Sequence, residues 1–268
     1  MEIGNFNFSI IELKFEPVER DYFFYGSYYR GMLGRYLKRR FCILKNMECQ
    51  LCPIKDKCLY MLSFEKYEDV LFPPYVINRA ERDRLRVVFV GSFSEFSEVY
   101  LEGFSKNLKP FEAGYFDPFE NKIRKDKVII NSRQIAQFKI KKDEINLIVR
   151  FARIKKDSKL INCEDINEKV FFDAIERRIY LINKYYGNSE FPVFLPDKKP
   201  FFELKNCRYH KIKRYSNRKK RSMQIPTATF GVKLRANAEE IYPFLYLSNF
   251  LNIGSNASMG FGVIELDE

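Results

Sequence analysis

The chain has 268 residues, of which 46% are hydrophobic, so it is long enough for two domains with substantial cores and too apolar to be disordered. Lys and Arg number 47 against 35 Asp and Glu, and the net charge of +12 favours a polyanionic partner such as RNA, DNA or an anionic membrane. No apolar run approaches the roughly 20 residues that span a bilayer, and the first residues lack the basic-then-apolar layout of a signal peptide, so we expect a cytoplasmic protein that does not bind membranes.

The first half of the chain alternates between strand and helix patterns. Apolar residues alternate over residues 5–15, recur at helical spacing over 25–41, and alternate again over 84–93. A second helix is predicted at 94–108, ended by Pro110, and one or two closing strands are predicted at 127–141.

The second half repeats this order more clearly. The pattern predicts, in chain order, a strand at 144–154, a helix at 165–186, strands at 201–213 and 225–235, a helix at 238–251 and a last strand from residue 263. A strand–helix–strand order that occurs twice is typical of the ferredoxin-like, or RRM-like, fold. The sequence therefore predicts an α+β protein with two tandem ferredoxin-like domains. The first, residues 1–141, carries a cysteine-cluster insertion, and the second, residues 142–268, carries a basic hairpin and a glycine-rich loop.

Four of the six cysteines lie within seventeen residues, at Cys42, Cys49, Cys52 and Cys58. The C-x6-C-x2-C-x5-C spacing suits a structural zinc ion or, less often, an iron–sulfur cluster, because soft sulfur ligands select these metals. Disulfides, which are disfavoured in the cytoplasm except in hyperthermophiles, and unligated thiols are the alternatives. In each case we expect a structural staple and not a reaction centre, and we expect Cys163 and Cys207 to be ordinary small apolar residues.

The first basic segment covers residues 25–40 and has helical spacing. Leu33 and Leu37 share its apolar face, whereas Arg35, Lys38 and Arg39 project elsewhere. Arg35, Arg39 and the preceding Arg30 are therefore candidates for binding a nucleic acid, and tyrosines beside them can stack on unpaired bases.

The second basic segment, residues 210–222, is predicted to be the loop of a β-hairpin. Eight of its thirteen residues are Lys, Arg or the only histidine of the chain, His210. Like charge at this density persists beside solvent or a polyanion, so the segment is either a solvated loop or a nucleic-acid contact. The candidate contacts are Lys211, Arg214, Tyr215, Arg218, Lys219, Lys220 and Arg221. An imidazole exchanges protons near neutral pH, so His210 is a candidate acid or base, with a structural histidine as the alternative.

A glycine-rich loop, residues 252–262, separates the last helix from the last strand. Glycine tolerates positive φ and lets another backbone approach closely, so Gly254, Gly260 and Gly262 are candidates for lining a phosphate chain. No Gly-Lys-Ser/Thr follows and the loop leads into a strand, which excludes a nucleotide-binding P-loop. The alternative is a tight turn.

Taken together, these segments resemble the RAMP superfamily, and more closely the sixth CRISPR-associated (Cas) family, the endoribonucleases that cut the precursor of CRISPR guide RNA. The resemblance spans residues 30 to 266 and rests on the order and spacing of several modest motifs. They are Arg30-Gly31-x-x-Gly34, Cys49-x-x-Cys52-Pro53 with Cys58, Phe172-x-x-Ile175-x-Arg177-Arg178, Arg214-Tyr215-Ser216-x-Arg218, and Asn252-Ile253-Gly254 followed after five residues by Gly260-Phe261-Gly262.

The resemblance implies two ferredoxin-like domains and a cut within CRISPR repeat RNA that needs no metal or other cofactor. It also implies products with a 2′,3′-cyclic phosphate and a 5′-hydroxyl. Two positions depart from the pattern. Asn252 replaces the usual first glycine of the signature, which is tolerable because Asn enters the left-handed region more readily than most residues. Many members place a catalytic histidine on or near the first helix, and residues 22–46 contain none.

Two assignments of the catalytic groups follow. In the first, His210 is the acid or base, and the phosphate is held by Arg214, Lys211 and Arg218. The second uses no histidine and relies on Tyr28 or Tyr29 with the first-helix cations Arg30, Lys38 and Arg39.

A competing class is a non-catalytic RAMP subunit that holds guide RNA together with other Cas proteins in an effector complex. A metal-dependent nuclease lacks support, because no closely spaced Asp/Glu set lies near the basic segments. The oligomeric state is not predicted.

Overall fold

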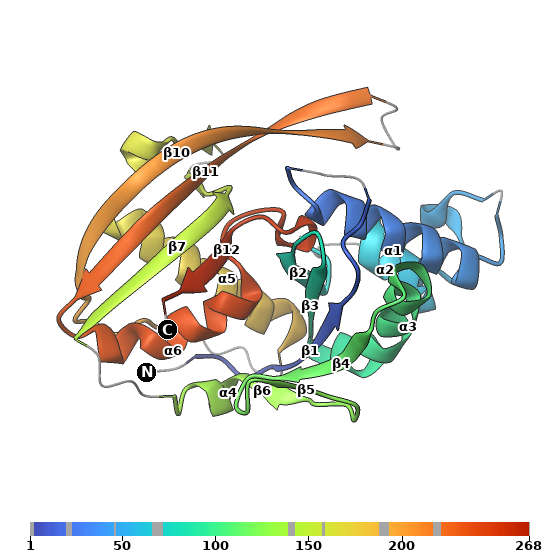
Figure 1. The fold of residues 1–268 in the computed structure, drawn as a ribbon, viewed down its shortest axis with the longest axis horizontal. Helices are drawn as coiled ribbons and strands as arrows, with labels where there is room; N and C mark the ends of the chain where they lie inside the picture. The colour runs from blue at the N-terminus through green and yellow to red at the C-terminus, as the bar shows by residue number, and fades with distance from the viewer. Residues whose placement is uncertain are drawn as a thin grey trace. The chain divides into compact units, whose positions relative to one another are not determined.

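The computed structural model describes residues 3–19, 23–45, 47–65, 72–138, 143–156, 159–187, 193–216 and 221–267, and the chain divides into two compact units (Figure 1). The N-terminal unit comprises residues 7–130, and the C-terminal unit comprises residues 131–268 with residues 1–6. The predicted boundary between residues 141 and 142 lies in the segment 139–142, outside the described residues. No helix in the described ranges is long and apolar enough to cross a bilayer.

The N-terminal unit is an antiparallel sheet with two long helices. Its elements are β1 (Asn7–Lys14), α1 (Gly26–Phe41), the short 3-10 helices η1 (Cys49–Leu51) and η2 (Lys55–Lys57), α2 (Leu59–Phe64), β2 (Tyr75–Ala80), β3 (Arg84–Val90), η3 (Gly91–Phe96), α3 (Ser97–Leu108), β4 (Glu112–Asp117), β5 (Lys122–Arg124) and β6 (Ile130–Asn131). The strands lie in the order β2-β3-β1-β4-β5, with β6 beside β1. With α1 after β1 and α3 after β3, this is the ferredoxin-like order, so the predicted fold is confirmed for this unit.

Three strands of this sheet, β2, β4 and β5, lie outside the predicted strand ranges. β4 supplies the fourth main strand, whereas only the short β6 falls within the predicted range 127–141. β4 is hard to recognise because it contains Gly114, where an added Cβ would lie 2.2 Å from the Arg124 carbonyl oxygen of β5. Glycine at this position reflects close approach of two backbones and not a preference for strand.

The core of the N-terminal unit lies between the sheet and one stripe of α1. Buried α1 residues recur at helical spacing: Tyr29, Met32, Leu33 and Leu37. They pack into one cluster with alternate residues of the sheet and with α3, including Ile11, Leu13, Val87, Phe89 and Phe104. This packing leaves the basic side of α1 exposed.

A buried ion pair crosses the sheet from β1 to β3. Glu12 is fully buried, and its carboxylate accepts hydrogen bonds from Arg84 Nε at 2.7 Å and Arg86 Nε at 2.5 Å. The Arg86 guanidinium also lies 3.8 Å from the ring centre of Phe116. Burial lowers the pKa of Arg86, while the adjacent Glu12 raises it, so each charge depends on the other to remain in the interior.

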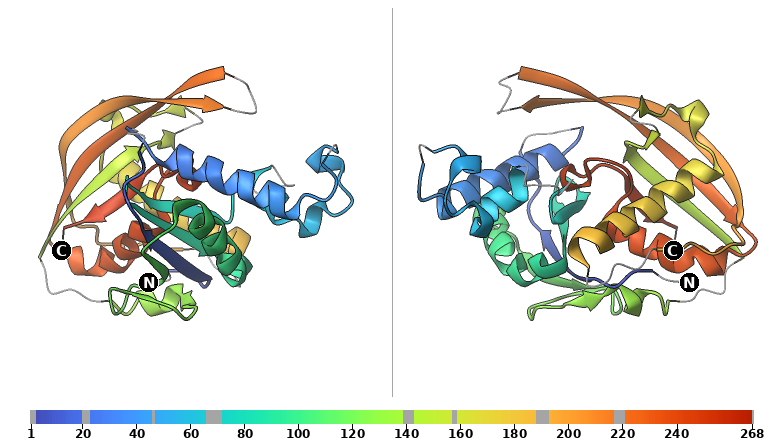
Figure 2. Two further views of the ribbon diagram at one scale, coloured as in Figure 1. Left: turned by 45° about the vertical axis from the view of Figure 1, so that its right-hand side comes forward. Right: turned by 180° about the vertical axis from the view of Figure 1, so that it is seen from behind.

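The C-terminal unit has the same topology. Its elements are α4 (Ser132–Ile135), β7 (Glu144–Ala152), β8 (Lys155–Lys156), β9 (Lys159–Leu160), η4 (Cys163–Asp165), α5 (Glu168–Tyr186), β10 (Phe201–Ser216), β11 (Arg221–Arg235), α6 (Ala238–Leu251), η5 (Ala257–Met259) and β12 (Val263–Leu266). The main sheet runs β10-β11-β7-β12, and α5 and α6 lie on one face of it (Figure 2). The predicted ferredoxin-like fold is therefore confirmed here as well.

A disulfide links η4 to β10. Cys163 and Cys207 are bonded, with their Cα atoms 5.7 Å apart, so the prediction that both are ordinary apolar residues is wrong. Cys207 follows Asn206, which has a φ of 43°, at a register shift in the β10–β11 ladder between Lys205 and Arg208. A bulge of this kind re-aims side chains, which accounts for a β10 cysteine reaching η4.

Candidate nucleic-acid interface

The basic hairpin of the C-terminal unit is a paired two-stranded arm. β10 and β11 continue past the end of β7 (Figure 1), since the last β11–β7 pair is Ala228 with Ala152. Beyond it, residues 210–216 pair in register with residues 221–227, and we call this part the basic arm. The predicted hairpin is thus present, but the prediction that residues 210–222 form its loop is wrong for 210–216 and 221–222. The buried apolar pair of Ile212 and Ile225 helps to anchor the ladder.

Several predicted contacts in the arm cannot be described. Arg218, Lys219 and Lys220 fall in the segment 217–220, outside the described residues, and the side chain of Tyr215 is also not described. Arg221 is exposed and pairs with Ser216 across the ladder.

Strand geometry sorts the remaining arm residues onto two faces. Successive side chains of a strand point to opposite faces, so His210, Ile212 and Arg214 share one face. Lys211 and Lys213 share the other, and both are exposed. Lys211 therefore lies on the opposite face from His210, which argues against the predicted role of Lys211 on the same phosphate.

His210 is half-buried at the base of the arm. Its ring packs edge-on against Phe151 of β7, with ring centres 5.6 Å apart. Phe151 lies in a bulge with a φ of 51°, and its N–H donates to Thr229 Oγ1 at 3.1 Å. Across the ladder from His210 is Thr227, a buried residue whose hydroxyl has no hydrogen-bond partner among the described residues. The imidazole is therefore positioned by packing on β7.

The glycine-rich loop folds back onto the end of β7 through backbone hydrogen bonds. The Ile253 N–H donates to the Gly262 carbonyl at 2.8 Å, and the Gly262 N–H donates to the Arg150 carbonyl at 3.0 Å. Gly262 has a φ of 73°, and an added Cβ would lie 1.8 Å from the Ile253 carbonyl oxygen. Gly254 has the same φ, and its Cβ would lie 2.6 Å from the Arg153 carbonyl oxygen. These glycines are required by the loop's own backbone.

Burial changes the predicted roles within this loop. Gly260 and Gly262 are buried, so the prediction that they line a phosphate chain is not supported, and their positive φ values explain their identity instead. Gly254 is partly exposed and remains a candidate. Asn252 has a φ of 57°, as expected where glycine is usual, and its side-chain amide donates to the Phe261 carbonyl at 3.0 Å.

Two arginines connect the basic arm, β7 and the loop. The Arg214 guanidinium donates to the Met259 sulfur, which brings the face of the arm that carries His210, Ile212 and Arg214 against the loop. We call this face the inner face of the arm and the opposite one its outer face. Arg153, which follows β7, donates from Nε to the Pro226 carbonyl at 3.2 Å, and its own carbonyl accepts from the Ser255 N–H at 2.9 Å. Burial lowers the pKa of Arg153. Sequence reasoning missed Arg153, because a single arginine after a strand carries no motif.

A third arginine fixes the start of the loop from α5. Arg178 is 7% exposed, and its Nε donates to the Leu251 carbonyl at 3.0 Å, at the end of α6. Burial lowers its pKa to about 10. This side chain joins the two helices of the C-terminal unit at the residue before Asn252. The sequence motif that contains Arg178 predicts no role for it, and its position identifies it as a support of the loop.

In the N-terminal unit, the predicted site residues on α1 differ in burial. Tyr29 is fully buried and its hydroxyl donates to the Glu81 carbonyl, and burial raises its pKa, so it is a core residue and not a group that orients reactants. Tyr28 is half-buried and packs edge-on against Tyr29. Arg30 is also committed to packing, since its guanidinium donates to the Tyr75 hydroxyl and lies 4.5 Å from the ring centre of Phe64.

The exposed cations of α1 are Arg35, Lys38, Arg39 and Arg40, and the first three were predicted from the helical spacing. Lys38 extends to 5.5 Å from the ring centre of Tyr60. These side chains form a basic surface of the N-terminal unit.

The four clustered cysteines, Cys42, Cys49, Cys52 and Cys58, are free and half-buried. All four line one cavity of the N-terminal unit. As placed, the described residues contain no group of three His, Cys, Asp or Glu side chains that could hold a metal ion.

Comparisons with known proteins agree with this architecture. Residues 12–99 match the family model described as AF_1859_N, N-terminal domain, which is less than half of the chain. The search of curated proteins gives no match.

Solved structures match over nearly the whole chain. Cas6 from Thermus thermophilus has a TM-score of 0.53 at 14% identity, over 98% of this chain and 99% of that one. A Cas6 product complex has a TM-score of 0.51 at 10% identity, over 98% and 100%. A partial Cas6-RT-Cas1–Cas2 complex has a TM-score of 0.56 at 11% identity, over 98% of this chain and 46% of that one. At these identities the likeness establishes the fold.

Proposed function

We propose that this chain is a Cas6-type endoribonuclease that binds CRISPR repeat RNA and cuts the precursor transcript without a metal ion. The observation that carries the proposal is local: within a unit of Cas6-like fold, the cationic inner face of the basic arm contacts the glycine-rich loop through Arg214 and Met259. The net charge of +12 fits an RNA partner. The Cas6 structure solved with its product and the Cas6-RT-Cas1–Cas2 complex make processed RNA and other Cas proteins the partners to test.

The proposed reaction is an internal transesterification. The ribose 2′-oxygen attacks the adjacent phosphorus, the bond from phosphorus to the 5′-oxygen breaks, and the products carry a 2′,3′-cyclic phosphate and a 5′-hydroxyl. A base takes the proton of the 2′-hydroxyl, and an acid gives a proton to the leaving 5′-oxygen. Alignment of the reacting atoms and fixed cations near the phosphate supply most of the acceleration.

The arm's inner face offers one proton-transfer group and one cation for the phosphate, which are two of the requirements of this reaction. His210 is the proposed acid or base, and Arg214, on the same face four residues further along β10, is the proposed phosphate ligand. Arg153 is a further cation beside this surface, because its Nε reaches the arm at the Pro226 carbonyl. Lys211, on the outer face, is proposed to bind RNA away from the reacting phosphate.

Two alternatives to this proposal predict different results in a cleavage assay. In the second catalytic assignment, Tyr28, Lys38 and Arg39 orient the reactants and His210 is dispensable. In the non-catalytic class, the chain binds repeat RNA, assembles with other Cas proteins and never cuts.

The experiment is incubation of the purified chain with labelled repeat RNA in EDTA, with analysis of both product ends. We expect one cut with the two ends named above. Replacing the 2′-hydroxyl at the cut by hydrogen should abolish cleavage and preserve binding. Cleavage of that substrate, or a requirement for a divalent ion, refutes the mechanism, and binding without cleavage favours the non-catalytic class.

Two neighbouring variants separate catalysis from binding. Loss of a general acid or base typically costs 10²–10⁴-fold in rate, so His210→Ala should lower the single-turnover rate at saturating RNA by about that factor. Lys211→Ala, on the opposite face of the same strand, should weaken binding and leave that rate within about threefold. If His210→Ala retains most of its rate, the first assignment is wrong and the second is favoured.

A further inference from the structure

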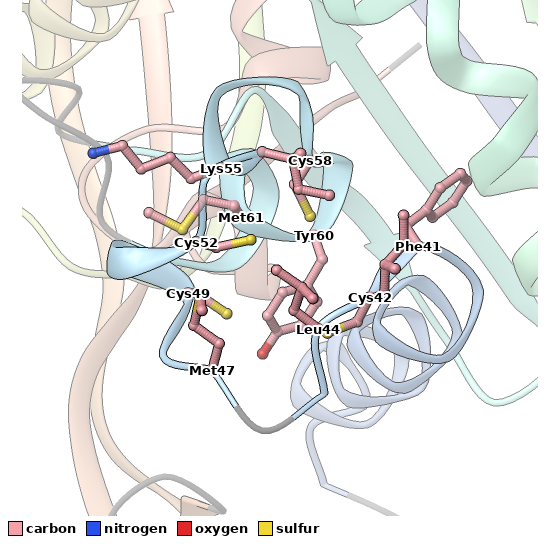
Figure 3. Close-up of a pocket in the computed structure, with 12 residues that line it drawn as sticks. Phe41, Cys42, Leu44, Met47, Cys49, Cys52, Lys55, Cys58, Tyr60 and Met61 are labelled. Carbon is pink, nitrogen blue, oxygen red and sulfur yellow. The ribbon is translucent and has the colours of Figure 1, made fainter.

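Four thiols converge on one small cavity of the N-terminal unit. Cys42 follows α1, Cys49 and Cys52 bracket η1, and Cys58 precedes α2. Figure 3 shows their sulfur atoms pointing toward a common centre. We call these four residues the four-cysteine cluster. Because they come from the end of α1, from η1 and from the start of α2, their convergence is a property of the fold and not only of sequence spacing.

Among the described residues that line the cavity, sulfur is the only soft donor. The other described lining side chains are mainly apolar, among them Phe41, Leu44, Met47, Ile54 and Met61, and none of them is a carboxylate or an imidazole. The cavity offers about 20 Å³ to the centre of a water-sized sphere, which is enough for one water or one ion.

Charges of both signs surround the cluster, since the Glu65 carboxylate and the Lys38 ammonium both act electrostatically on Cys49. Four thiolates around one divalent ion carry a net charge of −2, and a compensating cation is at hand in Lys55, which lines the cavity. Lys38 is also close, because its ammonium lies 5.5 Å from the ring centre of Tyr60, another lining residue. Soft thiolate ligands in tetrahedral number select zinc among the common biological divalent ions.

We propose that the four-cysteine cluster binds one structural zinc ion. Because the described side chains as placed form no group that could hold a metal ion, binding must draw the four sulfur atoms in to about 2.3 Å from the ion. The two ligands around η1 can follow, because that segment is a single turn, closed by a 3.3 Å hydrogen bond from the Cys52 N–H to the Cys49 carbonyl. A change of side-chain rotamer redirects each sulfur.

The consequence is a brace at the end of α1. The zinc ion would join the last turn of α1 to α2 and so fix the half of α1 that carries Lys38 and Arg39. Structural zinc contributes directly to folding, so the ion would stabilise the N-terminal unit without taking part in RNA cleavage. This inference does not depend on the proposed function.

The test measures metal in the purified full-length chain. We expect one zinc ion per chain by mass spectrometry of the metal content, and release of that zinc when a mercurial blocks the thiols. Substitution with cobalt should give the thiolate-to-cobalt absorption of a tetrahedral site. A chain that binds neither zinc nor cobalt in this way, or that contains stoichiometric iron and acid-labile sulfide, overturns the proposal.

Matched cysteine variants assign the site. Cys52→Ser should lose most of its zinc and weaken the thiolate-to-cobalt absorption, whereas Cys207→Ser should keep full zinc although it breaks the disulfide. If Cys52→Ser does not fold, thiol counting on the wild-type chain decides. The four free thiols should be protected before zinc removal and reactive after it, and equal reactivity in both states contradicts the proposal.

Discussion

Gly262→Ala tests whether the glycine-rich loop is held by its own backbone. The substitution puts a Cβ 1.8 Å from the Ile253 carbonyl oxygen, which no rotamer can relieve because alanine has none. It also forces a side chain into a backbone with φ of 73°, at a cost of about 1–2 kcal/mol. The loop must shift, and the shift breaks the hydrogen bonds that join Gly262 to Ile253 and Arg150.

The magnitude follows from these contacts. Each buried hydrogen bond that is lost costs about 1 kcal/mol, and more where a group is left unpaired. We therefore expect Gly262→Ala to lower the free energy of unfolding of the C-terminal unit by about 3–5 kcal/mol. Urea unfolding followed by circular dichroism measures the loss, and hydrogen exchange of residues 252–262 localises it.

Gly31→Ala is the matched control. Gly31 lies inside α1, and an added Cβ would meet only Arg35 Nη1 at 3.7 Å. Alanine there should raise stability by about 0.5–1 kcal/mol, because glycine is unfavourable in a helix interior. If Gly262→Ala changes stability by less than about 1 kcal/mol and leaves loop exchange unaltered, the account of the loop is refuted.

Two further perturbations address the interior of each unit. Glu12→Gln removes the buried charge that pairs with buried Arg86 and half-buried Arg84 of β3, and it should cost about 3–5 kcal/mol by urea unfolding. Glu112→Gln, in an exposed pair, should cost less than about 1 kcal/mol, and similar losses for both would contradict the buried-pair argument. Reduction of the Cys163–Cys207 disulfide, which spans 44 residues, should cost the C-terminal unit about 4 kcal/mol. Reductant should not affect Cys207→Ala beyond that variant's own loss, and an unchanged melting curve of the reduced wild type would count against the disulfide.

Much of the fold could be predicted because its elements have strong, local patterns. The helix predicted at 238–251 matches α6, and the alternation of Ile145, Leu147 and Val149 identified β7. The length of the basic arm could not be predicted, because its charges hide the strand pattern and its pairing depends on the opposite strand. The Cys163–Cys207 bond was equally hidden, since the connectivity of distant cysteines cannot be read from sequence.

The candidate site was predicted less well, for reasons that differ by residue. Tyr29 could have been excluded, because it lies four residues before Leu33 and therefore on the apolar face of α1. The opposite faces of His210 and Lys211 follow from strand alternation only once residues 210–216 are known to be strand. Arg153 depends on tertiary packing alone and carries no sequence signal.

The basic arm has a consequence for self-association. Over residues 210–216 and 221–227, the described strands pair with each other and with no further strand of the described sheet. The described edges of such a ribbon have no strand beside them, although the Pro226 carbonyl accepts from Arg153, and an edge without a neighbouring strand is the template on which strands of other molecules dock and aggregate. Lysine and arginine along these edges repel a second copy of the same ribbon, so the charges that attract a polyanion also protect the free protein from sticking to itself.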